Sequence, residues 1–281
     1  MLVKRMAKSS KLKSGIIGHK VLAATRQGVT KQAYEIKTTE DRIRLVPLND
    51  WHLGAPENQC DLKKIKAEIN YILRTPNTYA IGLGDYCDCA QKMPGRRGPS
   101  VFLQSLDPQT QMETAIELLT PLAKAKKLLG LHDGNHEQWI AEVTGINIVK
   151  IIADGLGVPY LGPACDTIVR LYNKNGKQKY LIYSQHGNSS AKLKHTKLGA
   201  LIAATKDIFA DVFLWGHVHQ IAVVKGGKRW NGKQMKCYYL LCGHFLKWEG
   251  SYAQMFGLDI CPAGTPKIQL FADRKDVHVS V

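Results

Sequence analysis

The sequence predicts a layered α/β protein with mixed sheets. Two observations indicate this class. Expected strands alternate with helices in the first half of the chain and dominate the second half. Most of the expected strands also end at a polar turn that carries Gly, Asp, Asn or His, and open α/β layers place ligand-binding residues at the carboxyl ends of strands in this way. The chain has 281 residues, which is enough for one large domain with a buried core.

The first half alternates strands and helices. Residues 42–49 form the first expected strand, which is followed directly by Asp50 and His52. A helix is expected over residues 61–74, because Asp61 can cap it and Leu62, Ile65, Ile69 and Ile72 mark one apolar face. The remaining expectations for this half are a strand over 79–84, a loop over 89–106, a helix that opens at Asp107-Pro108, and a strand over 128–132.

The second half is richer in strands. A short helix is expected after Asn147, and helical spacing covers residues 192–209. Strands are expected near 166–172, 179–185, 212–215, 220–225 and 236–242, with further short strands from residue 256. The last two of the five strands flank a basic hairpin over residues 225–233.

The N-terminal segment is basic. Residues 1–34 contain eight Lys or Arg residues and no Asp or Glu. We expect a basic extension over residues 1–38 and a catalytic domain over 39–281. Residues 1–15 suit a flexible tail, and short helices could begin near Val21 and Lys31. The segment is either a solvated tail or an arm for the backbone of a nucleic acid.

Composition narrows the protein class. No apolar run is long enough for a membrane helix, and the N-terminus lacks the apolar core of a secretory signal, so no membrane partner is expected. The seven cysteines have no disulfide-framework spacing, which favours reduced thiols and a cytoplasmic protein. The net charge of +16 attracts polyanions, although solubility alone would also explain it.

Five short blocks carry the chemistry: Asp50-Trp51-His52, Gly84-Asp85, Gly134-Asn135-His136-Glu137, His186-Gly187 and Gly216-His217-Val218-His219. Residues two apart on an extended segment point the same way, so each Asp-x-His or His-x-His pair can face one cluster. Carboxylate, amide and imidazole groups together suit transition metals. A lone block has a structural explanation, but the ordered set predicts a metal centre.

The same ordered set resembles the calcineurin-like metallophosphoesterase superfamily, and the match covers residues 42–243. The resemblance implies a four-layer α/β/β/α sandwich with two mixed sheets and a site for two divalent ions. Manganese is favoured, and zinc, iron, nickel and cobalt are alternatives. The implied ligands of one ion are Asp50, His52, Asp85 and His219. The implied ligands of the other are Asp85, Asn135, His186 and His217, with Asp85 as the bridge.

The resemblance also implies two catalytic residues. His136 would protonate the leaving oxygen, and Asp88 would orient His136. Alternatively, His136 is a fifth ligand and Asp88 only caps a loop. The implied reaction is in-line attack on phosphorus by a hydroxide that bridges the two ions. We expect three other histidines near the blocks to be structural or exposed: His132, His195 and His244.

The expected substrate is a phosphodiester of nucleic acid or nucleotides. Cys89 replaces the Arg that protein phosphatases of this superfamily carry at the second block, which argues against a phosphoprotein substrate. The net charge, the basic hairpin with Trp230, and Arg96 and Arg97 as substrate-binding residues favour a nucleic acid or nucleotide. The alternatives are a small-molecule phosphomonoesterase and a non-catalytic metal-binding scaffold.

Overall fold

The structure is a computed structural model that describes residues 14–23, 28–56, 59–90, 104–230, 232–249, 254, 257 and 260–281. Its helices are α1 (Leu62–Arg74), α2 (Pro108–Lys124), α3 (Asn135–Thr144), α4 (Ile148–Leu156) and α5 (Lys194–Ala204). The strands up to the middle of the chain are β1 (Gly15–Ala23), β2 (Val29–Lys37), β3 (Arg42–Leu48), β4 (Thr78–Gly82), β5 (Leu128–His132) and β6 (Tyr160–Gly162). The later strands are β7 (Ala164–Tyr172), β8 (Lys177–Gln185), β9 (Val212–Trp215), β10 (Ile221–Trp230), β11 (Lys233–Cys242), β12 (Lys267–Phe271) and β13 (Val277–Ser280).

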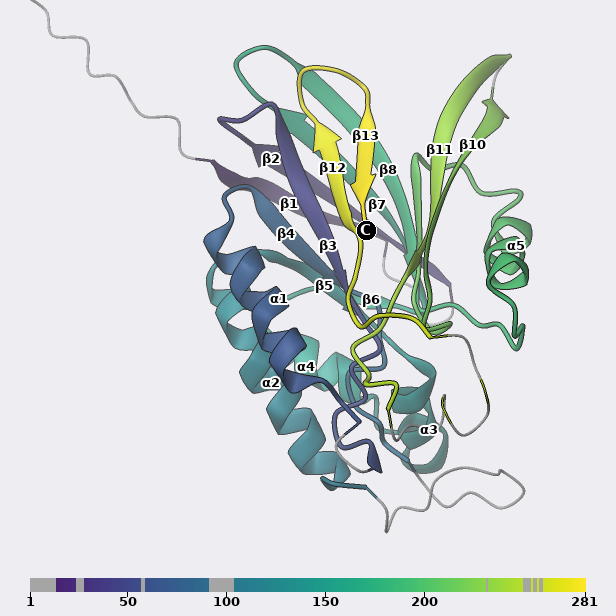
Figure 1. The fold of residues 1–281 in the computed structure, drawn as a ribbon. Coiled ribbons are helices and arrows are strands. Elements are labelled where there is room, and N and C mark those ends of the chain that lie inside the picture. Colours follow the sequence, from purple (N-terminus) through teal and green to yellow (C-terminus); the bar gives the residue numbers. More distant parts are fainter. Residues whose placement is uncertain are drawn as a thin grey trace, which may run out of the picture.

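The strands form two mixed sheets that pack face to face, with helices on both outer faces (Figure 1). One sheet has six strands in the order β13-β12-β3-β4-β5-β6, and the other has seven in the order β1-β2-β7-β8-β9-β11-β10. Helices α1, α2 and α4 cover the six-stranded sheet, and α5 covers the other (Figure 1). The predicted four-layer α/β/β/α sandwich is therefore confirmed.

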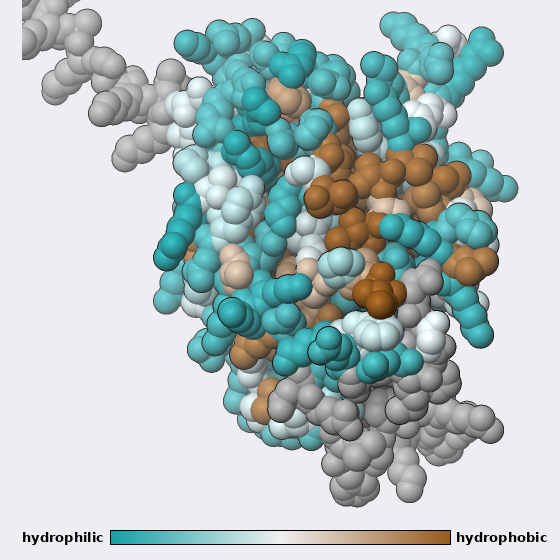
Figure 2. Space-filling model, in the orientation of Figure 1, coloured by the Kyte–Doolittle hydropathy of each residue, from teal (hydrophilic) through white to brown (hydrophobic). Residues whose placement is uncertain are grey.

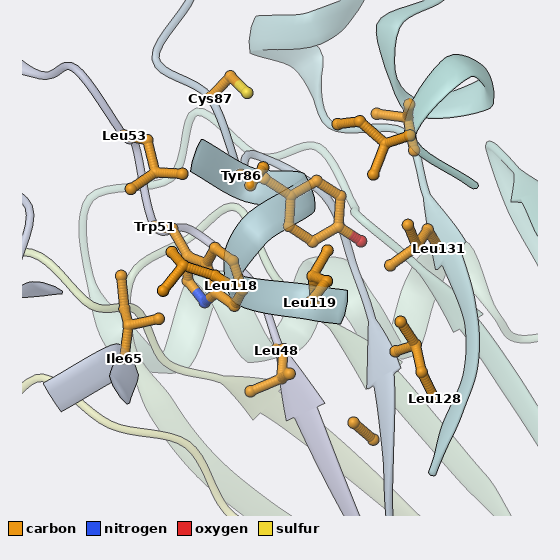
Figure 3. Packing of buried hydrophobic residues seen from close by; sticks show 14 of the residues in the cluster. Leu48, Trp51, Leu53, Ile65, Tyr86, Cys87, Leu118, Leu119, Leu128 and Leu131 are labelled. Carbon is orange, nitrogen blue, oxygen red and sulfur yellow. The ribbon is translucent and has the colours of Figure 1, made fainter. Parts of the chain in front are cut away.

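Three hydrophobic clusters hold the four layers together. The cluster between the sheets includes Tyr34, Leu45 and Ile182, all of them buried. The cluster under α1, α2 and α4 includes two aromatic residues that lie beside predicted ligands. Trp51 and Tyr86 follow Asp50 and Asp85 directly, and their rings meet edge to face at 5.6 Å (Figure 3). Burial of these two rings anchors the backbone on which the polar neighbours sit.

The helices proposed near Val21 and Lys31 were wrong. Residues 15–23 and 29–37 form β1 and β2, and β2 pairs in parallel with β7. Burial along β2 follows a period of two, but the buried positions include the polar residues Thr30 and Gln32. Because apolar alternation is the usual signal of a half-buried strand, this polar alternation concealed it. The division at residues 38 and 39 stays a prediction, and residues 1–13 lie outside the described part of the chain.

The other expected helices and strands are confirmed, with small shifts at their ends, while most of the loop expected over residues 89–106 lies outside the described residues. Asp61 and Asp107 cap α1 and α2 as predicted, and Asn147 caps α4. One helix was missed, because α3 begins inside the third motif block, at Asn135. Among the described residues, no helix is long and apolar enough to span a membrane. All seven cysteines are free thiols.

The β10–β11 hairpin is longer than expected and projects from the body of the fold (Figure 1). Its tip is hydrophilic, and hydrophobic residues gather between it and the C-terminal strands (Figure 2). Each strand residue advances about 3.3 Å, so the ten residues of β10 place the tip about 30 Å from the start of the strand. His219 lies just before that start, so the tip is far from the motif residues.

Candidate metal centre

The five motif blocks follow the carboxyl ends of five strands. Asp50, Asp85 and Asn135 come after β3, β4 and β5, which are parallel neighbours in the six-stranded sheet. His186 and His217 come after β8 and β9, which are parallel neighbours in the seven-stranded sheet. Parallel strands end at the same edge of a sheet, so the two packed sheets bring all five blocks to one seam.

The first group of donors consists of Asp50, His52 and His219, whose ligand atoms all lie within 4.8 Å of one another. His219 Nε2 lies 3.0 Å from Asp50 Oδ1 and 3.2 Å from His52 Nε2. His52 Nδ1 faces Asp88 Oδ1 at 3.3 Å, so its Nε2 is directed to the group. A carboxylate on the outer nitrogen of an imidazole is a usual support for a metal ligand.

The second group consists of Asp85, His186 and His217, with Asn135 in contact. His186 Nε2 lies 3.1 Å from Asp85 Oδ2 and 3.0 Å from Asn135 Oδ1, and His217 Nδ1 lies 2.8 Å from the same amide oxygen. Asp85 Oδ2 is also 3.7 Å from His52 Nε2. Asp85 therefore stands between the two groups, in the place predicted for the bridge.

The chemistry of these donors fits a cation. His186 Nδ1 is 2.8 Å from the Leu83 carbonyl oxygen, and donation there leaves the lone pair of Nε2 facing Asp85 and Asn135. Three acceptor atoms so close together require a proton or a metal ion among them. Burial lowers the pKa of His186, but Asp85 and Asp50 outweigh it and raise the pKa to about 10. The second group thus attracts a positive charge strongly.

The backbone at the donors is unusual. Asp50, His52, Asp85, His217 and His219 all have positive φ, between 48° and 62°. L-residues rarely adopt this region, and each such residue costs about 1 kcal/mol or more. These five make up most of the eight non-glycine residues with positive φ in the described part of the chain. Such strain persists where packing and hydrogen bonds enforce it, and it concentrates at functional sites.

Glu137 is a structural support that the sequence analysis missed. This side chain is buried, and its two carboxylate oxygens accept backbone N–H groups from three residues. Oε2 accepts from Asp85 at 3.1 Å and from Gly134 at 3.0 Å, and Oε1 accepts from Cys87 at 2.9 Å. The carboxylate therefore joins the second block to the third. Its position after Gly-Asn-His is visible in the sequence, but two of its three partners, Asp85 and Cys87, lie about fifty residues away.

Glycine is required where these two blocks touch. A Cβ on Gly134 would lie 2.0 Å from Asp85 Oδ1, and a Cβ on Gly84 would lie 2.5 Å from the Gly134 nitrogen. Gly84 also has φ +95°. The close approach lets the backbone N–H of His136 donate to Asp85 Oδ1 at 3.0 Å. Asp85 is thus held by hydrogen bonds as well as by packing.

His136 lies beside the first donor group. Its ring meets His52 edge to face at 4.5 Å and contacts Trp139 at 4.1 Å. Its Nδ1 hydrogen-bonds the backbone carbonyl of Asp88, while the Asp88 carboxylate is 3.6 Å away and lies closer to His52. Asp88 therefore contacts His136 mainly through its backbone. Burial lowers the pKa of His136, but Asp85 and Asp88 outweigh it and raise the pKa.

The remaining residues from the sequence analysis are three histidines, which have structural or exposed positions, and two arginines, which the structure does not describe. His132 is buried between the Gly162 carbonyl oxygen and Ser184 Oγ, and His244 bonds Cys261 and Leu246, which are structural roles. His195 is exposed. Arg96 and Arg97 lie outside the described residues, so their substrate-binding role stays a prediction.

No sequence family matches the chain, and no curated protein matches it either. Solved structures match it in fold. A predicted phosphoesterase from Streptococcus pneumoniae is 11% identical, with 85% of this chain and 88% of that chain covered and a TM-score of 0.34. A metallophosphoesterase from Sphaerobacter thermophilus is 12% identical, with 85% and 89% covered and a TM-score of 0.35. Zinc-complexed wild-type Vps29 from Entamoeba histolytica is 12% identical, with 85% and 97% covered and a TM-score of 0.38.

Proposed function

We propose that this chain is a metal-dependent phosphoesterase that hydrolyses phosphodiesters of nucleic acid or nucleotides. The convergence of the five motif blocks at one seam carries the proposal. Asp50, His52 and His219 would hold one divalent ion, and Asn135, His186 and His217 would hold a second, with Asp85 shared. Manganese is the favoured metal, with zinc, iron, nickel and cobalt as alternatives. When bound, two such ions neutralise charge on phosphoryl oxygens and acidify water.

The protein residues would orient the substrate and supply a proton. His136 carries its Nδ1 proton toward the Asp88 carbonyl oxygen, so Nε2 is the atom that can exchange a proton with the leaving oxygen. Neighbouring carboxylates raise the pKa of His136, which favours the protonated ring that a general acid needs. The hydrogen bond to Asp88 fixes the ring in this orientation.

Chelation of the wild type, together with a variant of the shared donor, tests whether hydrolysis depends on bound metal. Activity on bis-p-nitrophenyl phosphate is expected to fall about 100-fold in EDTA and to return with Mn²⁺. Asp85→Asn should reduce activity to a similar extent, because the shared donor loses its charge. Asp207→Asn is the matched control, since that side chain is 87% exposed. Undiminished turnover in EDTA, or an Asp85→Asn enzyme as fast as the wild type, would contradict the proposal.

The proposal that the substrate is a nucleic acid is supported by positive charge on a hairpin that extends away from the seam. The β10–β11 hairpin carries Lys225, Arg229, Lys233 and Lys236 as exposed cations. Lys228 has a structural role instead, because it donates to backbone carbonyls just beyond α5. A mononucleotide bound at the seam would not reach a tip about 30 Å away, whereas a polynucleotide would.

This distance provides a test of the substrate. In the variant Arg229→Gln/Lys233→Gln/Lys236→Gln, the KM for a polynucleotide should rise about tenfold, and its dependence on salt should weaken. The rate on bis-p-nitrophenyl phosphate should stay within about twofold of the wild type. The charge-matched control is Lys174→Gln/Lys177→Gln/Lys179→Gln on the β7–β8 hairpin. Equal losses in both variants would indicate a general charge effect, and faster turnover of p-nitrophenyl phosphate than of diesters would favour a phosphomonoesterase.

A further inference from the structure

A cavity of about 550 Å³ opens beside the second donor group. It lies between α3, α5 and the carboxyl ends of β8 and β9. Asn135, His186 and His217 belong both to its wall and to the donor group. A substrate with its phosphate at the donors would therefore lie beside this cavity. The volume lies within the usual range for small-molecule sites.

We propose that this cavity holds the base of the nucleotide whose phosphate is bound at the donor groups. The proposal rests on the proposed phosphoesterase function and deepens it. Gln138, Gln185 and Asn188 line the cavity with side-chain amides, which carry both donors and acceptors, and Gln185 Oε1 also accepts from the Tyr183 hydroxyl at 3.1 Å. The edge of a nucleobase carries the same mixture of donors and acceptors.

The charge of the cavity wall disfavours a phosphate group as the ligand of this cavity. The chain has a net charge of +16, yet no Lys or Arg is among the described residues that line this cavity. Its one carboxylate, on Asp133, already accepts hydrogen bonds from Tyr160 and from Asn147. A neutral group with polar edges fits this wall better than an anion does.

Part of the cavity wall is formed by small or apolar residues. Ala200 and Ala204 lie one turn apart on α5, and their small side chains leave room above the helix. Gly187 lies against the indole of Trp215, because a Cβ there would be 2.8 Å from Trp215 Cδ2. Small residues over a buried ring produce a flat apolar surface, which suits the face of a planar heterocycle.

Trp215 is a buried aromatic residue of the cavity wall. The indole is 3% exposed and lines the cavity, and its Nε1 has no hydrogen-bond acceptor among the described residues.

Matched substrates test the inference in the metal-loaded enzyme. The p-nitrophenyl esters of thymidine and adenosine 5′-phosphates carry a base, and the esters of ribose 5-phosphate and methyl phosphate do not. Ala204→Leu fills the cavity and should raise the KM for the nucleotide esters about tenfold. The kcat/KM for methyl p-nitrophenyl phosphate should stay within about twofold. The control Ala203→Leu adds the same side chain at a neighbouring exposed position of α5 that does not line the cavity.

A second variant removes an amide without filling space. Gln138→Met keeps the length of an exposed side chain, and it should raise the KM for the nucleotide esters about threefold to tenfold. If the ribose 5-phosphate ester is as good a substrate as the nucleotide esters, or if Ala204→Leu affects all four esters equally, the inference is overturned.

Calorimetry with phosphate-free thymidine and adenosine separates the inference from the proposed function. Suppose that none of the esters is hydrolysed, and that either nucleoside binds to the wild type but not to Ala204→Leu. This result would refute the phosphoesterase and support the base site. Suppose instead that the esters are hydrolysed with no preference for the nucleotide esters, and that neither nucleoside binds. This result would support the phosphoesterase and refute the base site.

Discussion

Replacement of Glu137 by Met should weaken the fold by an amount that depends on pH. The variant keeps the volume of the side chain but removes the acceptor of three buried backbone N–H groups. Each N–H left without an acceptor costs about 1–3 kcal/mol, so the three together cost about 6 kcal/mol. Against this, burial and then Asp85 raise the pKa of Glu137 to about 7. The variant has no carboxyl to ionise in this buried place. At pH 8 it therefore avoids an ionisation cost of about 3 kcal/mol that the folded wild type carries.

The sign of the pH dependence follows from the raised pKa. Below the ordinary pKa of 4.5 the carboxyl is protonated in both the folded and the unfolded chain, so its burial carries no ionisation penalty. As the pH rises to about 7, the wild type loses this part of its stability and the variant does not. Glu137→Met should therefore be about 6 kcal/mol less stable than the wild type at pH 4.5 and about 3 kcal/mol less stable at pH 8.

Urea unfolding of the metal-free protein at several pH values measures this difference. The matched control is Glu142→Met, an exposed position on the same helix, which should change stability by about 0.5 kcal/mol or less. In the metal-loaded protein, Glu137→Met should lower kcat about 10- to 100-fold, because Asp85 loses a backbone support. A stability gap that is constant or grows as the pH rises would refute this reasoning.

Three further predictions concern other supports of the seam. Lys197→Met should weaken metal binding about tenfold. The buried ammonium of Lys197 donates at 2.9 Å to the carbonyl oxygen of Val218, which lies between the last two donor histidines. The control Lys194→Met, at an exposed position, should not weaken metal binding. His132→Gln should come closer to wild-type stability in urea as the pH falls from 6.5 toward 4. Burial lowers the pKa of His132 to about 4 in the folded protein. Over this range the histidine of the unfolded chain is protonated first, and the wild type loses stability. Gly134→Ala should abolish metal binding measured by calorimetry, because its Cβ would lie 2.0 Å from a donor carboxylate, while Gly155→Ala meets no atom within 4 Å and should raise the melting temperature.

The sequence predicts the strands that deliver the donors, for a physical reason. Each of these strands is an apolar run that ends at a polar turn, and both signals are local. The ends of β3, at Leu48, and of β9, at Trp215, both just before a motif block, could therefore be located without any knowledge of the fold. Parallel strands with packed sheets then bring those ends together, whereas the division of the donors into two groups was implied by the resemblance alone.

The supports of the site could not be predicted in the same way, because they depend on contacts between distant segments. Glu137 satisfies N–H groups of the second block, and the sequence gives no sign that residues 85–87 lie beside it. Asp88 was predicted to orient His136 with its carboxylate, but the main contact is through its backbone carbonyl, which every residue possesses. β2 was missed for a related reason, because Gln32 and Thr30 are buried by neighbours that only the sheet provides.

The two sheets contribute different chemistry to the centre, and this makes their packing part of the function. The six-stranded sheet supplies both carboxylates, the amide and the imidazole of His52, whereas the seven-stranded sheet supplies only imidazoles. A pair of cations at the seam needs the negative charge of one sheet and the neutral donors of the other, so neither sheet alone could form the centre. The apolar cluster between the sheets therefore sets the distances among the donors. Substitutions that change volume in that cluster should disturb metal binding even though they touch no ligand, because close-packed interiors transmit such strain.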